Sequence, residues 1–219
     1  MGVRSAAAAL VDLVLPGQCA GCAEPVTPWC GHCAARLGER RWPVLTDAPP
    51  VLTATRYTGP PRTALLRYKE RGRRDLVAPL ALLLGESLDE VVRPPPAATW
   101  LVPAPSRPSA ARERGGDHVA RLCRAMAAER PHVRVTRALR LARRARDSMG
   151  LDAAQRAANL AGSLRVDPAC LPPPGAVVVL VDDVVTTGAT VRACTRTLAA
   201  AGVPVEAAVV LCDATSGSR

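Results

Sequence analysis

Aromatic residues are scarce in this chain of 219 residues: phenylalanine is absent, and only three tryptophans and two tyrosines occur. Because hydrophobic residues still make up 48% of the sequence, we expect a globular core built from valine, leucine and alanine. The arginines are not interleaved with aromatics, which argues against a platform that stacks the bases of single-stranded nucleic acid. The length fits one medium-sized domain with a small added module.

The sequence also lacks an apolar run long enough to cross a bilayer, so we expect no membrane span. Arg4 followed by the apolar residues 6–10 faintly resembles a signal peptide, but Asp12 interrupts the run. We therefore interpret the first residues as a short packed helix.

Lysine is nearly absent too, because Lys69 is the single lysine and arginine carries the remaining positive charge. The formal net charge is +10, and it is concentrated in two segments. Residues 56–74 contain seven basic residues and one acidic residue, and residues 107–146 contain twelve basic and three acidic residues. Such patches suit a phosphate-rich partner, either nucleic acid or a diphosphate; a solvated helix surface is the alternative.

Four of the eight cysteines are clustered near the N-terminus in the pattern C-x2-C-x7-C-x2-C. Two matched pairs this close together predict a closed tetrahedral shell of four thiolates around a structural zinc ion, with Gly21 and Gly31 supplying the turns. His32 is an alternative ligand, and a redox dithiol is an alternative use of the cysteines. The predicted ligands are Cys19, Cys22, Cys30 and Cys33.

This zinc module is too short to bury much of a core alone, so the metal would supply its folding energy. We expect Trp29 and Trp42 to cover its apolar side, and the module to dock onto the larger domain or onto a partner. The prolines of residues 43–50 indicate a linker. The predicted organisation is an N-terminal module over residues 1–46 and a second domain over residues 51–219.

The remaining four cysteines lie in apolar or helical surroundings, where cysteine behaves as a small core hydrophobe. Without a disulfide framework, a reducing and therefore cytoplasmic location is expected. These residues are Cys123, Cys170, Cys194 and Cys212.

The rest of the chain alternates strand and helix patterns, which predicts an α/β fold with a parallel sheet flanked by helices. Strands are predicted over residues 51–57, 99–102, 133–139, 178–181 and 205–211. Helices are predicted before Gly72, from Asp75 to residue 88, over residues 117–128, from Asp152 to residue 160, and over residues 191–201. Residues 140–150 form a basic connection without a clear period, which is typical of a mobile loop.

The most informative segment is residues 178–190, where an apolar strand is followed by Asp182 and Asp183, a Thr-Thr-Gly-Ala-Thr turn and a helix. The two acids end the predicted strand at the carboxyl edge of the sheet, where open α/β folds bind ligands. Carboxylates suit ribose hydroxyls or a metal ion. The small residues of the turn let main-chain N–H groups approach a phosphate at a helix N-terminus. The strand–turn–helix order therefore predicts a sugar-phosphate site rather than a solvated turn.

This segment resembles the phosphoribosyl-diphosphate (PRPP) binding motif of type I phosphoribosyltransferases. With the four-cysteine module, the whole layout resembles the ComF family, in which a four-cysteine finger precedes a type I phosphoribosyltransferase-like domain. Family members commonly carry Arg-Gly-Phe-Asn-Gln where this chain has residues 114–118, so the role of that segment is left open. Further matching segments are Tyr57-x-Gly59-x-x-Arg62, Lys69 with Arg71-Gly72, residues 102–105, Arg114-Gly115 and Arg156-x-x-Asn159.

The resemblance implies roles for individual residues. Asp182 and Asp183 would be the catalytic pair, which holds ribose hydroxyls and stabilises the sugar cation, and Mg²⁺ would accompany PRPP as its cofactor. The 5′-phosphate would be bound by Thr186, Thr187, Gly188, Ala189 and Thr190, and Val184 and Val185 would also belong to the PRPP-binding residues. The diphosphate would be contacted by Ser106, Arg107, Arg112 and Arg114.

The ComF family is linked to natural competence, in which single-stranded DNA enters the cytoplasm alongside a helicase-like partner. The resemblance therefore implies single-stranded DNA and a competence helicase as partners, besides PRPP or a related ribose phosphate. Three hypotheses stay open: an active phosphoribosyltransferase with an unidentified acceptor, a catalytically silent accessory protein that binds nucleic acid or the helicase, and a PRPP-sensing regulator. A hood formed by the zinc module and residues 51–75 would read the acceptor.

Overall fold

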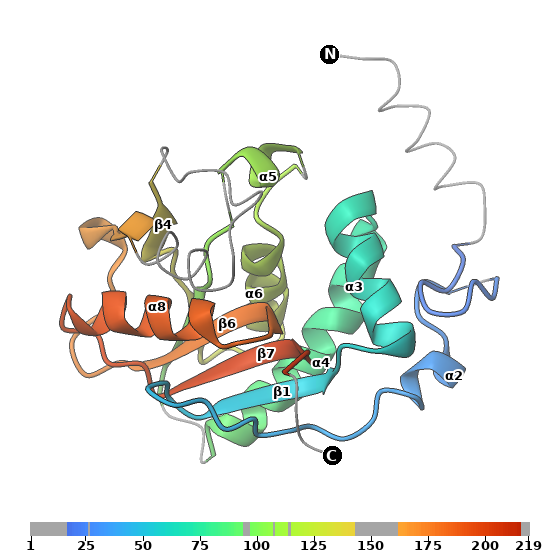
Figure 1. Ribbon diagram of the computed structural model, residues 1–219, viewed down its shortest axis with the longest axis horizontal. Coiled ribbons are helices and arrows are strands. Elements are labelled where there is room, and N and C mark those ends of the chain that lie inside the picture. Colours follow the sequence, from blue (N-terminus) through green and yellow to red (C-terminus); the bar gives the residue numbers. More distant parts are fainter. Residues whose placement is uncertain are drawn as a thin grey trace.

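A parallel five-stranded sheet, in the order β1-β7-β6-β2-β3, forms the centre of the protein (Figure 1). The computed structural model describes residues 17–25, 27–93, 97–106, 108–113, 115–142 and 162–215. The strands of the sheet are β1 (Val51–Arg56), β2 (Thr99–Pro103), β3 (Val133–Val135), β6 (Val177–Val185) and β7 (Ala207–Asp213). All four strand pairs are parallel, which confirms the predicted α/β class and sheet. A separate antiparallel pair joins β4 (Leu139–Leu141) to β5 (Leu164–Val166).

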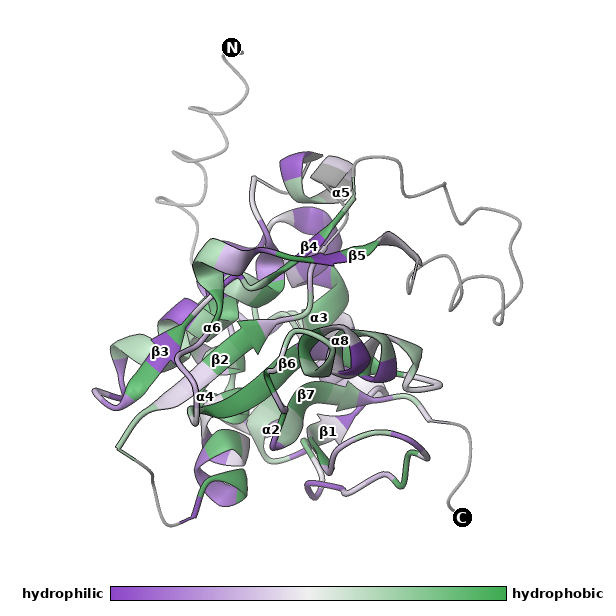
Figure 2. Ribbon diagram, turned by 90° about the vertical axis from the view of Figure 1, so that its left-hand side faces the viewer, coloured by the Kyte–Doolittle hydropathy of each residue, from purple (hydrophilic) through white to green (hydrophobic). Residues whose placement is uncertain are grey.

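Helices cover both faces of the sheet, and each face has its own hydrophobic core (Figure 2). On one face, β6 contributes Val179 and Val181 to a core shared with three helices, α3 (Gly59–Arg71), α4 (Val77–Val91) and α6 (His118–Ala128). On the other face, Val178 and Leu180 pack with α8 (Ala189–Ala199). Leucine, valine and alanine dominate both cores, as the scarcity of aromatic residues predicts. The short helices are α2 (Gly31–Ala34), η1 (Arg74–Leu76), α5 (Pro108–Glu113) and η2 (Pro168–Cys170).

Some element ends agree with their predicted positions and others differ. Gly72 ends α3 in the left-handed conformation, with a φ of 66°, as predicted. Asp75 does not cap α4, because η1 precedes that helix and the Asp75 carboxylate instead pairs with Arg73 at 2.6 Å. The single strand predicted over residues 133–139 is interrupted, and β3 and β4 form in its place. The predicted helix from Asp152 and most of the predicted loop over residues 140–150 lie outside the described residues.

The segment before β1 protects the edge of the sheet. Arg41 N donates to the carbonyl of Thr53 at 3.1 Å, and Thr53 N donates to the carbonyl of Arg41 at 2.9 Å. The Thr55 hydroxyl donates to the carbonyl of Leu37. This contact covers an edge strand that would otherwise offer unpaired groups to another chain. Within residues 51–75, which were expected to help read an acceptor, β1 is the edge strand of the central sheet.

Three of the four isolated cysteines are core residues, as predicted. Cys123, Cys194 and Cys212 are buried, whereas Cys170 in η2 is only half-buried, so the prediction is wrong for that residue. Burial raises the pKa of the Cys212 thiol to about 12, which keeps it protonated and unreactive. Within the described ranges, no helix combines the length and the hydropathy needed to cross a membrane.

Candidate functional site

Asp182 and Asp183 are neighbours on β6 but belong to opposite faces of the sheet, because successive side chains of a strand alternate. β6 continues to Val185, so the prediction that the two acids end the strand is wrong. Asp183 faces α3 and α6, where Lys69 Nζ and His118 Nε2 each lie 2.6 Å from its Oδ2 atom. Asp182 belongs to the α8 face. Only 8% of the surface of Asp182 and 7% of that of Asp183 is exposed.

The surroundings separate the pKa values of the two carboxyl groups. Burial and the neighbouring charge of Asp183 raise the pKa of Asp182 to about 8. Burial acts in the same direction on Asp183, but the hydrogen bond from His118 and the charge of Lys69 outweigh it and hold its pKa well below the usual range. At neutral pH, Asp183 is therefore the charged carboxylate, and Asp182 is largely protonated.

His118 links Asp183 to the loop that follows β2. Its Nδ1 atom lies 3.2 Å from Ser106 Oγ, so a hydrogen-bonded chain runs from Ser106 through the imidazole to Asp183. The backbone of His118 is held as well, because Tyr68 donates from its hydroxyl to the His118 carbonyl at 2.8 Å. The ring of Tyr68 meets the imidazole edge-on, with centroids 6.2 Å apart.

Asp117 joins the same loop to the start of α6. Its Oδ1 atom accepts from Ala120 N at 3.0 Å, which caps the helix, and its Oδ2 atom accepts from Ser106 N at 3.0 Å. Asp117 and His118 belong to the segment that departs from the ComF pattern and whose role the sequence left open. Both side chains have hydrogen-bond partners in the structure. For Asp117, the sequence offered a signal, because an aspartate directly before a helical pattern is typical of a helix N-cap.

The turn at residues 186–190 leads from β6 into α8. Thr186 and Thr187 are exposed, Gly188 caps α8 with a φ of 75°, and Ala189 and Thr190 begin the helix. A Cβ atom on Gly188 would lie 2.7 Å from Leu45 Cδ1, so the segment before β1 packs directly on this turn.

Val184 and Val185, which were predicted to bind PRPP, are the last residues of β6 and pack in the two cores. Of the residues expected to contact a diphosphate, Ser106 lies in the Asp183 network, and Arg112 is exposed on α5. Arg107 and Arg114 lie outside the described residues.

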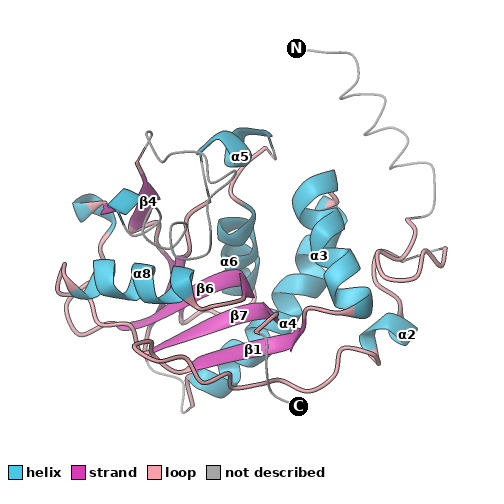
Figure 3. Cartoon of the chain, in the orientation of Figure 1, coloured by secondary structure: helices cyan, strands magenta, loops and turns pink. Residues whose placement is uncertain are grey.

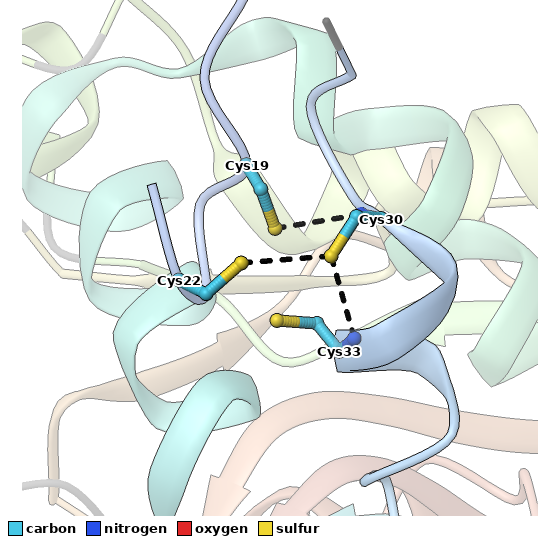
Figure 4. A group of neighbouring side chains, drawn as sticks. All are labelled: Cys19, Cys22, Cys30 and Cys33. Carbon is cyan, nitrogen blue, oxygen red and sulfur yellow. Dashed lines mark hydrogen bonds between the residues drawn. The ribbon is translucent and has the colours of Figure 1, made fainter. Parts of the chain in front are cut away.

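The four predicted metal ligands come together as expected. The four sulfur atoms lie within 4.8 Å of one another, and Figure 4 shows Cys19, Cys22, Cys30 and Cys33 converging on one point. Although burial opposes it, main-chain N–H groups of Cys22, Cys30 and Gly21 lower the pKa of Cys19 to about 6, which favours the thiolate that binds metal. The all-sulfur donor set and its close geometry fit a structural zinc ion. His32 is exposed on α2 and is not part of the cluster.

The two glycines of the module have different roles. A Cβ atom on Gly21 would lie 2.5 Å from Cys33 Sγ and 2.8 Å from Pro60 Cβ, so only glycine allows this close approach to α3. A Cβ atom on Gly31 would meet nothing within 4 Å. Gly21 lies in a turn over residues 20–22, as predicted, whereas Gly31 is the first residue of α2, so the prediction is wrong for Gly31.

The module docks on α3, the helix that carries Lys69 (Figure 3). Arg67 on α3 donates to the carbonyl of Cys19 at 3.2 Å, and Arg73 donates to the carbonyl of Gln18 at 2.8 Å. Trp29 packs against both the cysteine cluster and the main core, as predicted. Trp42 is 50% exposed, so the prediction that it covers the module is wrong.

Comparison with known proteins finds a family match in the C-terminal part of the chain. Residues 133–219 match the family model of the phosphoribosyl transferase domain. No curated protein matches the chain. Among solved structures, a mutant of hypoxanthine phosphoribosyltransferase from Trypanosoma cruzi in a ternary complex with substrates is 20% identical, over 66% of this chain and 69% of that chain, with a TM-score of 0.36. The Trypanosoma cruzi enzyme in complex with the product IMP is 21% identical, over 66% of this chain and 68% of that chain, also with a TM-score of 0.36.

The matched residues include β6 with both acids, the turn at residues 186–190, and α8. The parallel sheet and the two cores agree with this match. The chain thus has an α/β fold with a parallel five-stranded sheet flanked by helices, a match to the phosphoribosyl transferase domain over residues 133–219, and a four-cysteine cluster near its N-terminus.

Proposed function

We propose that the protein binds a 5-phosphoribosyl ligand at the carboxyl edge of its sheet, with PRPP and Mg²⁺ as the ligand pair and phosphoribosyl transfer as the class of reaction. The observation that carries this proposal is the position of Asp183. It is a buried, charged carboxylate on the strand that leads into the turn at residues 186–190, inside the matched phosphoribosyl transferase domain. Ligands of open α/β sheets bind at this edge.

Each part of the proposed site has a distinct task. The turn at residues 186–190 would bind the 5′-phosphate with main-chain N–H groups at the start of α8. Asp183 would accept a hydrogen bond from a ribose hydroxyl through Oδ1, since Lys69 and His118 engage its Oδ2 atom. Loss of the diphosphate leaves positive charge on the sugar, and the fixed negative charge of Asp183 would stabilise that charge electrostatically.

The two proposed metals have different positions. Zinc in the four-cysteine cluster would be structural, because four protein ligands leave no open position. Mg²⁺ would neutralise the diphosphate of PRPP. Lys69 and His118 already engage Asp183 Oδ2, and Asp182 Oδ1 accepts a hydrogen bond from Asp183 N at 2.8 Å. We therefore expect Mg²⁺ to be coordinated mainly by oxygens of PRPP and by water, and not by these two carboxylates.

Calorimetric titration of PRPP with Mg²⁺, and of ribose 5-phosphate, tests the proposal. We expect Asp183→Asn to weaken binding by roughly tenfold or more, the effect of losing one charge-assisted hydrogen bond. Glu206→Gln is the matched control, because Glu206 is exposed before the first residue of β7, at the opposite edge of the sheet. Failure of the unaltered protein to bind either compound would rule the proposal out.

A second candidate function is binding of single-stranded DNA in a competence role, together with a helicase. The observation that favours it is the number of exposed arginines on α3 and its flanks: Arg56, Arg62, Arg71 and Arg74. We expect such binding to weaken steeply with salt and to survive Asp183→Asn. If PRPP binds without being consumed and changes the affinity of the protein for a partner, the result would instead favour a PRPP-sensing regulator.

A further inference from the structure

The four-cysteine module and Asp183 contact opposite sides of α3. Arg67 and Lys69 are two positions apart, which places their side chains about 200° apart around the helix axis. Arg67 Nη1 donates to the carbonyl of Cys19 at 3.2 Å, whereas Lys69 Nζ donates to Asp183 Oδ2 at 2.6 Å. The helix therefore connects the predicted zinc site to the buried carboxylate.

The module also contacts both ends of this helix. A Cβ atom on Gly21 would lie 2.8 Å from Pro60 Cβ, so the module approaches the first turn of α3 closely. Just beyond the last turn, Arg73 donates to the carbonyl of Gln18 at 2.8 Å. Together with the Arg67 contact, these interactions fix the position of α3 along its whole length.

The module depends on its metal to hold the helix in this way. Ala20 is fully buried and belongs to the same hydrophobic core as Leu65 and Tyr68 of α3. Among the described residues, the module's own core consists of cysteines with Trp29 packed against them. A core this small takes its folding energy from the bound metal. Loss of zinc would therefore remove the contacts that fix α3 and expose the core beside Ala20.

We propose that metal occupancy of the four-cysteine cluster controls the affinity of the sugar-phosphate site, with α3 as the connecting element. In the zinc-bound form, Lys69 and His118 fix Asp183 Oδ2 and leave Oδ1 for a ribose hydroxyl. In the metal-free form, α3 is released and Lys69 no longer stabilises this orientation of the carboxylate. The inference rests on the proposed function, because it assumes that a ribose phosphate binds at Asp183.

The coupling is tested by calorimetric titration with ribose 5-phosphate in the absence of Mg²⁺, which a zinc chelator would also bind. We expect removal of zinc to weaken binding of this ligand by roughly tenfold, the effect of one charge-assisted hydrogen bond. Lys69→Met should bind the ligand weakly with or without zinc, because the link to Asp183 is lost. Arg71→Met, on the same helix but exposed, is the control and should keep the full dependence on zinc.

Zinc affinity provides a second measurement, because coupling between two binding sites is reciprocal. Saturating ribose 5-phosphate should therefore raise the affinity for zinc by the same factor, roughly tenfold. Competition with a chromogenic chelator measures this change, and Lys69→Met should abolish it.

Arg67→Met tests the connection in the zinc-loaded protein, so it does not require the metal-free chain to stay folded. The variant lacks the hydrogen bond to the carbonyl of Cys19 and keeps all four cysteines. We expect it to bind ribose 5-phosphate about threefold more weakly, the effect of one ordinary hydrogen bond, while retaining one zinc ion per chain. Circular dichroism and thermal unfolding check that the metal-free protein and the variants are folded.

The outcomes separate this inference from the proposed function. Equal affinities of the zinc-bound and metal-free proteins for ribose 5-phosphate, or an unchanged dependence on zinc in Lys69→Met, would overturn the inference and leave the proposed function intact. If the metal-free protein unfolds as a whole, Arg67→Met decides, and an affinity equal to that of the unaltered protein would overturn the inference. If the zinc-loaded protein binds neither ribose 5-phosphate nor PRPP, the proposed function fails and the inference fails with it.

Discussion

Lys69 Nζ lies 2.6 Å from Asp183 Oδ2, although 114 positions separate the two residues in the chain. The contact joins α3, on which the four-cysteine module docks, to the strand that carries both acids. His118 completes the arrangement from α6, so two helices and a strand meet on one carboxylate oxygen.

We expect Lys69→Met to lower the free energy of unfolding at pH 7 by about 1–3 kcal/mol, because Asp183 would keep its buried charge and lose a partner. In the Asp183→Asn background, the same substitution should cost less, and a double-mutant cycle by chemical denaturation measures the difference. Arg71→Met, on the same helix but exposed, is the control and should be nearly neutral. Equal effects of Lys69→Met and Arg71→Met would contradict the assigned contact.

The free energy of unfolding should depend on the ionisation of Asp182. The pKa of this group rises from 3.8 to about 8 on folding, so the folded state holds a proton that the unfolded chain releases between these values. Its contribution to stability is therefore greatest below pH 4 and declines as the pH rises to 8. Asp182→Asn removes the dependence, and we expect it to gain roughly 1–3 kcal/mol relative to the unaltered protein between pH 5.5 and 8.5. Chemical denaturation at several pH values gives the free energy of unfolding of both proteins. If it changes with pH in the same way for Asp182→Asn and for the unaltered protein, Asp182 is not protonated in the folded protein.

Gly21 and Gly31 provide a matched pair of substitutions in the four-cysteine module. We expect Gly21→Ala to lower both the melting temperature and the bound zinc, because its Cβ would lie 2.5 Å from Cys33 Sγ and 2.8 Å from Pro60 Cβ. Gly31→Ala should be tolerated, since nothing lies within 4 Å of its Cβ. Zinc content by mass spectrometry under native conditions, together with thermal unfolding, provides the comparison. A zinc content of one ion per chain in both variants would refute the close packing inferred at Gly21.

The turn at residues 186–190 can be tested with another matched pair. Gly188 and Gly202 both have positive φ, at 75° and 78°, so alanine should cost about 1–2 kcal/mol at either position. Only at Gly188 would the new Cβ also collide with Leu45, at 2.7 Å. We expect Gly188→Ala to be the more destabilising change and to weaken ribose 5-phosphate binding, and Leu45→Ala to restore part of the loss. If the two glycine variants behave alike, Leu45 does not support the turn.

Local patterns in the sequence predicted the sheet, the cysteine cluster and the helix that follows residues 178–190. These features depend on residues close together in the chain: the spacing of two cysteine pairs, an apolar run, and Gly72 at the end of a helix. These predictions agree with the structure because interactions between residues close together in the chain determine these features in the folded protein.

The network around Asp183 was not predictable in the same way. His118 lies 65 positions from Asp183 and Lys69 lies 114 positions away, so their meeting depends on how the helices pack on the sheet. The opposite faces of Asp182 and Asp183 follow only once β6 is known to continue to Val185. Trp42 was misplaced for a similar reason, since nothing local indicates that Arg41 pairs with β1 and leaves the next residue exposed.

A crystal structure of the protein with ribose 5-phosphate tests the central claim most directly. We predict the phosphate within hydrogen-bond distance of main-chain N–H groups in residues 186–190, and a ribose hydroxyl on Asp183, with Lys69 and His118 still at Oδ2. A ligand bound elsewhere on the chain, with this turn and Asp183 left free, would contradict the proposed sugar-phosphate site.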